Sequence, residues 1–154
     1  MKSPYRYTLS RTLPNGGPTW LWVMLNPSTA DAFKDDNTIK RVKSFTAAGG
    51  GGELFVANLY AWRATEPRDL FMLPEAQRVG PINDMVIRQF LDEVRRTGGK
   101  VVVAWGAQPK ARGRIEVVVR DLRQSGPLFC LGKNQDRSPK HPLYVPGSQK
   151  LVPY

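Results

Sequence analysis

Runs of apolar residues alternate with amphipathic segments along most of the chain. Four runs are almost wholly apolar, which is typical of strands covered on both faces in a parallel sheet: 20–25, 54–59, 100–105 and 128–131. Between them, three segments place apolar residues at helical spacing: 38–48, 81–97 and 109–124. The last segment also holds β-branched residues that favour a strand, but its spacing favours a helix.

The first residues predict a further strand. Residues 5–11 alternate and are β-prone, and the Pro, Asn and Gly residues of 14–18 form a turn before the run at 20–25. We therefore predict a single α/β domain over 1–154 with three αβα layers. Its central sheet is expected to have four mainly parallel strands, preceded by an N-terminal antiparallel hairpin.

Polar residues follow the predicted strands at the edge where open α/β sheets bind ligands. Asn26 follows the first apolar run, and Ser28 lies just beyond the rigid Pro27. The Asn26 carboxamide can hold a water or a base edge, or make a turn bond to the backbone. Asn58 interrupts the second run, where an unpaired amide costs about 1 to 3 kcal/mol. Its partner is either a ligand or a neighbouring loop.

Two titratable residues are candidates for catalysis. His141 is the only histidine, and it can donate a hydrogen bond to a leaving group or shuttle a proton. A lone loop histidine is also often structural or exposed. Asp36 is the nearest to the helix start of three aspartates, with Asp31 and Asp35, and it either caps the helix or acts as a general base.

Arginine and aromatic residues near the strand ends suggest a substrate with a base and a phosphate. Arg63 can bind a phosphate through two hydrogen bonds, and four aromatic residues can stack on a base: Tyr60, Trp62, Trp105 and Tyr144. Such aromatic residues also commonly belong to the core, which we expect in part for Trp105.

Composition indicates which chemical class of partner the protein binds. The net charge of +10 arises from 23 Lys and Arg residues against 13 Asp and Glu. Such a charge either attracts polyanions such as nucleic acid or nucleotides, or only keeps the protein soluble. Basic residues also mark the last predicted helix and suggest a basic outer face: Lys110, Arg112, Arg114, Arg120 and Arg123.

With a single cysteine an internal disulfide is excluded, and with a single histidine a metal would rest almost wholly on carboxylates, so we expect neither metal nor cofactor. No apolar stretch reaches the roughly 20 residues that span a membrane. The first residues lack the pattern of a secretory signal, and we expect no membrane partner and a cytoplasmic location.

Several motifs together resemble a bacterial and phage family known only as a domain of unknown function: YRYTLSR, VMLNPSTAD, DDNTIKR, NLYAWRATEP, VVVAWG and HPLYVP. The order of strands ending in Asn-Pro, Asn and Trp-Gly, followed by a late His-Pro, is more distantly similar to the uracil-DNA glycosylase superfamily. That resemblance implies a glycosylase-like fold in which Asn26 positions the hydrolytic water. It also implies that Asn58 recognises the base and that His141 stabilises the departing base.

This chain departs from the superfamily in one motif, because His141-Pro142-Leu143-Tyr144 replaces the usual His-Pro-Ser-Pro. The resemblance therefore does not supply the loop that wedges into a duplex. Three hypotheses follow. The first is an enzyme that hydrolyses the N-glycosidic bond of an ordinary or modified base. The second is a non-catalytic module that binds nucleic acid or nucleotides, and the third is a protein that binds an acidic partner.

Overall fold

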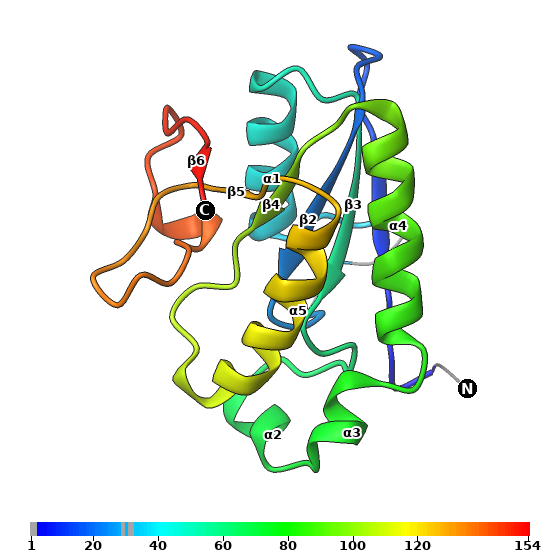
Figure 1. Cartoon of the computed structure of the whole chain (residues 1–154), viewed down its shortest axis with the longest axis vertical. Helices are drawn as coiled ribbons and strands as arrows, with labels where there is room; N and C mark the ends of the chain where they lie inside the picture. The colour runs from blue at the N-terminus through cyan, green and yellow to red at the C-terminus, as the bar shows by residue number, and fades with distance from the viewer. Residues whose placement is uncertain (1–2, 29, 31–32) are drawn as a thin grey trace.

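The computed structural model describes residues 3–28, 30 and 33–154, and in them a mixed six-stranded sheet forms the centre of the molecule (Figure 1). The strand order is β1-β3-β2-β4-β5-β6. The strands are β1 (Leu9–Thr12), β2 (Thr19–Met24), β3 (Glu53–Asn58), β4 (Val101–Val103), β5 (Phe129–Cys130) and β6 (Val152–Pro153). β2 pairs in parallel with β3 and β4, and β4 pairs in parallel with β5. The edge strands β1 and β6 are antiparallel to their neighbours.

The predicted N-terminal hairpin is wrong. β1 pairs with β3, with Leu9 opposite Val56, and β2 lies on the other side of β3. The reason is burial: every residue of β2 is buried, so this strand takes an interior position with a neighbour on each edge, whereas β1 is partly exposed and suits an edge.

Glycines allow the connection from β1 to β2 to cross the end of β3. The Gly52 amide donates to the Pro18 carbonyl oxygen at 2.9 Å, and the Leu13 amide donates to the Gly52 carbonyl oxygen at 2.8 Å. A Cβ atom on Gly17 would overlap the Gly50 carbonyl oxygen, and one on Gly52 would overlap Gly17. Gly17 and Gly52 therefore have a structural role, since side chains at these two positions would separate the loops.

Three long helices agree with the predicted segments, although α4 begins at Asn83 instead of Pro81. Two short helices between β3 and α4, and the strand β6, were not predicted. The helices are α1 (Asn37–Ala48), α2 (Pro67–Phe71), α3 (Glu75–Val79), α4 (Asn83–Thr97) and α5 (Arg112–Gln124), with 3-10 turns η1 (Pro109–Ala111) and η2 (Pro142–Tyr144).

The sheet separates two apolar clusters. Alternate residues of β2 point to opposite faces: Trp20 and Trp22 pack with α1, whereas Leu21 and Val23 pack with α4 and α5. The sheet is therefore a layer between α1 on one face and α4 and α5 on the other (Figure 1). No helix in the described part of the chain has the length and apolar character needed to cross a membrane.

Candidate functional site

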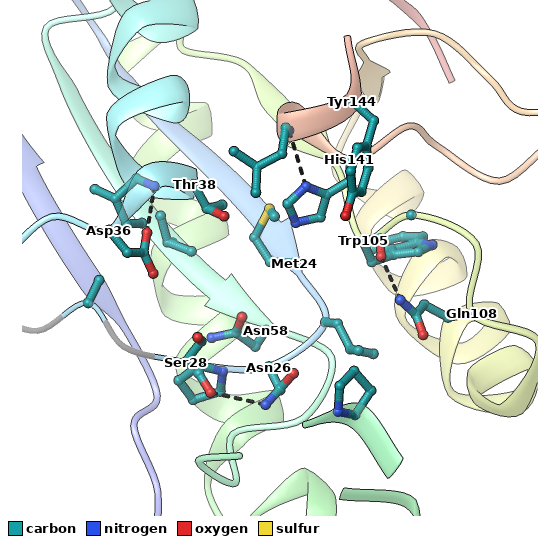
Figure 2. Close-up of a pocket in the computed structure, with 18 of the residues that line it drawn as sticks. Met24, Asn26, Ser28, Asp36, Thr38, Asn58, Trp105, Gln108, His141 and Tyr144 are labelled. Atoms are coloured by element: carbon teal, nitrogen blue, oxygen red, sulfur yellow. Dashed lines mark hydrogen bonds between the residues drawn. The ribbon is translucent and has the colours of Figure 1, made fainter. Parts of the chain in front are cut away.

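A pocket of about 670 Å³ opens where β2, β3 and β4 end (Figure 2). Its volume is within the range of small-molecule sites. Seven of the predicted site residues line it: Asn26, Ser28, Asp36, Asn58, Trp105, His141 and Tyr144. The third hypothesis, an acidic partner protein, is favoured if the protein's own side chains fill the strand-end pocket, and this pocket is open instead.

Asn26 is held in one orientation. Its Nδ2 donates to the carbonyl oxygens of Pro27 at 3.0 Å and Ala64 at 2.7 Å. Because both partners are acceptors, the amide nitrogen must face them, and no hydrogen bond to a described residue uses Oδ1. The predicted turn bond is therefore present, but the side chain still offers a fixed acceptor at the pocket wall.

Asn58 is the last residue of β3 and is only 5% exposed, yet it lines the pocket. Its carboxamide makes no hydrogen bond to any residue that the structure describes. Its backbone carbonyl oxygen, by contrast, accepts from Asn83 Nδ2 at 2.9 Å. Its amide atoms are not among the buried polar atoms without a partner, because they reach the pocket, so this side chain has a donor and an acceptor available for a guest there.

His141 precedes η2, and its neutral ring has a defined tautomer. Its Nδ1 accepts from the Leu143 amide at 3.2 Å, so the neutral ring carries its proton on Nε2. Burial lowers the pKa of His141 below the ordinary value of 6.5, and the negative charge of Asp36 opposes this shift. The imidazole lies over the centre of the pocket (Figure 2), where a neutral ring offers an N–H donor.

The three neighbouring aspartates have different environments. Asp36 caps α1, because its Oδ1 accepts from the Ile39 amide at 2.8 Å, and it also lines the pocket. Asp35 pairs with Lys43 at 2.9 Å and with Arg11 at 2.7 Å, and these hydrogen bonds lower the pKa of its carboxyl group. Asp31 lies outside the described residues. The structure therefore supports the capping role of Asp36 and leaves a catalytic role as a hypothesis.

The aromatic residues divide between the pocket wall and its rim. Trp105 is 1% exposed and packs edge to face against Tyr154, with 6.2 Å between ring centres, so it is mainly a core residue with one edge in the pocket. Tyr144 is 82% exposed, and its ring centre lies 5.6 Å from that of His141. Tyr144 therefore presents a free aromatic face at the entrance.

Two predicted binding residues do not line the pocket. Tyr60 is buried in the core, where its ring contacts Phe71 at 5.7 Å and the Arg78 guanidinium at 5.2 Å. Burial raises the pKa of its hydroxyl group. Arg63 lies further along the same segment, and its amide donates to the Pro4 carbonyl oxygen at 2.9 Å. The chain stays paired with the β2 segment beyond Asn58, through the Leu59 and Tyr60 amides, so the predicted strand end lies before its true end.

The structure adds residues that the sequence did not indicate. Lys140 lines the pocket, and its side-chain ammonium makes no hydrogen bond or ion pair with the described residues, so it brings a positive charge to the site. Arg6 also lines the pocket and donates to the Ala30 carbonyl oxygen. Gln108 is a third added lining residue, and its Nε2 donates to the Trp105 carbonyl oxygen at 3.1 Å. The position of Lys140 directly before His141 was the only sequence signal for it.

No group of three His, Cys, Asp or Glu residues is placed to hold a metal ion within 3–28, 30 and 33–154.

Comparison with known proteins gives one result. A family model described as a protein of unknown function, DUF1643, matches residues 6–143. No curated protein and no solved structure matches significantly. The family model covers most of the chain, and it spans the pocket residues from Arg6 to Leu143. The chain belongs to the DUF1643 family.

Proposed function

We propose that the protein binds a nucleobase of a nucleotide or nucleic acid in this pocket and hydrolyses the N-glycosidic bond of that base. The observation that carries the proposal is Asn58, whose buried carboxamide lines the pocket without a hydrogen-bonding partner among the described residues. A carboxamide offers both a donor and an acceptor, which matches the edge of a base. Tyr144 adds an exposed aromatic ring for stacking, whereas Trp105 contributes only an edge to the wall.

The other two groups suit the bond to be broken. Cleavage of an N-glycosidic bond through an oxocarbenium-like state requires a placed water and stabilisation of the leaving base. The Asn26 Oδ1 is a fixed acceptor that can orient the water toward the sugar carbon. The neutral His141 can donate its Nε2 proton in a hydrogen bond to the charge that develops on the base. These roles are also those that the resemblance to the uracil-DNA glycosylase superfamily implies.

The test is release of free base from a panel of substrates. Oligonucleotides carrying uracil, mismatched thymine or modified pyrimidines, and the corresponding free nucleosides, are incubated with the protein and the products are separated. We expect release from at least one substrate. Asn26→Ala and His141→Ala should each slow this release by about 100-fold or more, since each removes a group that acts in the transition state.

Asn15→Ala is the matched control, because Asn15 is an exposed loop residue that does not line the pocket. It should release base at the rate of the unmodified protein. Release from no substrate, or release that Asn26→Ala and His141→Ala leave unchanged, contradicts the catalytic proposal.

A second candidate is a non-catalytic module that binds nucleotides or nucleic acid. One observation favours it: among the described lining residues Asp36 is the only carboxylate, and it already caps α1. Equilibrium dialysis with nucleosides and nucleotides separates the two candidates. Binding that Asn58→Leu weakens, with no released base from any bound compound, supports the module, whereas released base supports the enzyme.

A further inference from the structure

A second hollow of about 710 Å³ lies between α5, the loop after β5 and Tyr154. We call it the basic groove. Four of its nine lining residues are cations and one is an acid, and the full lining is Ile115, Glu116, Val119, Arg120, Arg123, Gln124, Lys133, Arg137 and Tyr154. Only two of the cations, Arg120 and Arg123, come from the helix on which the sequence predicted a basic face. Arg114 of that face is buried instead.

The positive charge of the basic groove is weakly neutralised. The carboxylate of Glu116 lies 3.7 Å from Arg112, and Arg120 lies 3.8 Å from Asp121, in pairs whose side chains are largely exposed. Exposed pairs of this kind are weak and are screened by salt. Lys133 and Arg137 make no ion pair with any residue in the described part of the chain. An anion in the groove therefore meets cations that are free to bind it.

An aromatic ring lies among these cations. The Tyr154 ring has the Arg123 guanidinium 5.4 Å from its centre and the Lys133 ammonium 5.5 Å from it. Arg123 also donates to the Tyr154 carbonyl oxygen at 2.9 Å, which holds the residue against α5. Cations beside an aromatic ring are the groups that bind a strand of nucleic acid through its phosphates and bases.

Arg137 has an unusual backbone conformation. Its φ angle is 69°, and it is the one residue other than glycine with a positive φ among those the structure describes. Its amide donates to the Asn134 carbonyl oxygen at 2.9 Å, which closes the turn. Glycine would adopt this conformation with less strain, so a long cation here is consistent with a function for its charge.

One loop connects the basic groove to the pocket. Lys133 and Arg137 line the groove, whereas Asn134 and Lys140 of the same loop line the pocket. On the other side, Tyr154 of the groove packs against Trp105, which lines the pocket. A strand bound in the groove therefore passes close to the pocket entrance.

We propose that the basic groove binds the sugar-phosphate backbone of a nucleic-acid strand, so that the pocket receives a base that belongs to a polymer. The polymer substrate of the pocket rests on the proposed function, whereas strand binding in the groove does not. The aromatic ring among spaced cations favours nucleic acid over an acidic protein as the partner.

The experiment measures binding of fluorescent oligonucleotides by anisotropy over a range of salt concentrations, with single-stranded DNA, single-stranded RNA and duplex DNA as separate arms. The groove variant is Lys133→Gln with Arg137→Gln. The control variant is Arg68→Gln with Arg88→Gln, two exposed arginines outside both hollows that lower the net charge equally. We expect the groove variant to lower the slope of log affinity against log salt by about 1.4 on single strands, whereas the control keeps the slope of the unmodified protein.

Equal loss of affinity in the two variants overturns the inference, because binding then follows net charge alone. Poly-L-glutamate that binds with the same dependence on Lys133 and Arg137 also overturns it, in favour of an acidic protein. If no substrate releases base but the groove variant still loses strand binding, the groove is supported and only the proposed function fails. If base release is as fast from free nucleosides as from oligonucleotides, the polymer substrate is contradicted.

Discussion

Two buried asparagines, Asn58 and Asn83, meet at the end of β3 and differ in their hydrogen-bonding partners. The Asn83 Nδ2 donates to the carbonyl oxygens of Asn58 at 2.9 Å and Leu59 at 3.3 Å, and the residue is fully buried. The Asn58 carboxamide has no such partner among the described residues and faces the pocket. The Asn83 nitrogen therefore stabilises the fold, although its Oδ1 is buried without a partner, whereas the Asn58 amide is left open to the pocket.

The same substitution should have opposite effects at these two positions. Asn58→Leu removes an unpaired polar group, so the free energy of unfolding should stay constant or rise by about 1 kcal/mol. Asn83→Leu removes two hydrogen bonds and should lower the free energy of unfolding by about 1 to 3 kcal/mol. Urea denaturation measures both changes. If Asn58→Leu destabilises as much as Asn83→Leu, the Asn58 amide is satisfied within the protein and loses its role as a ligand group.

His141 should make stability depend on pH near neutrality. Burial lowers its pKa in the folded state, so the unfolded state binds more protons between that lowered pKa and about 6.5. Stability is therefore unaffected by His141 at higher pH, and it is lost as pH falls below about 6.5 toward the folded pKa. His141→Gln removes this contribution.

Chemical denaturation of both proteins from about pH 7.5 to about pH 5 tests the direction of this effect. The stability of the unmodified protein relative to His141→Gln should decrease as pH falls. Parallel stability curves for the two proteins would show that the ring is not buried in its neutral form.

Among the elements, those with strong local patterns could be predicted and those fixed by distant contacts could not. The apolar stripe of α4 and the buried runs of β2 and β3 have clear periodicity. The partner of β1 depends on the close approach of the loops at Gly17 and Gly52, which no local pattern contains. β6 has two residues, too few for any period to appear.

The start of α1 combines a structural and a candidate catalytic role in Asp36. Asp36→Ala should lower the free energy of unfolding by about 1 kcal/mol, because the Ile39 amide loses its cap. Asp36→Ser should restore the cap and most of that stability, but it brings no charge to the pocket. Thermal unfolding and base release are measured on both variants. Full activity in Asp36→Ser assigns Asp36 to capping, whereas loss of activity in a stable Asp36→Ser protein assigns it to catalysis.

For the whole molecule, the location of the pocket was more predictable than the identity of the residues that line it. Asn26, Asn58 and His141 come from distant segments, but the carboxyl ends of parallel strands meet at one edge, and this rule brings the first two together. Tyr60 was misplaced because pairing continues beyond β3: the Leu59 and Tyr60 amides donate to the Met24 and Leu25 carbonyl oxygens at 2.9 and 3.0 Å. The rule locates the site residues only when the last paired residue of each strand is known.

Arg114 shows how a charged residue of a predicted outer face can instead connect the layers. It is 5% exposed; its Nε donates to the Leu59 carbonyl oxygen at 2.8 Å, and its guanidinium binds Asp84 of α4 at 2.7 Å. This side chain therefore joins α5 to α4 and to the chain just after Asn58. Arg114→Leu should lower the free energy of unfolding by about 2 to 3 kcal/mol, since hydrogen bonds of a charged group are lost.

The matched variant Asp84→Asn tests which of these contacts matters. Asp84 is half exposed, so this variant weakens the ion pair but keeps the bond from Arg114 to Leu59, and it should cost about 1 kcal/mol or less. Because Arg114 and Asn83 hold the same carbonyl oxygen of Leu59, their combined loss should differ from the sum of the single losses. A double-mutant cycle of Arg114→Leu and Asn83→Leu in urea measures this coupling. Strict additivity would mean that the two residues do not support the end of β3 together.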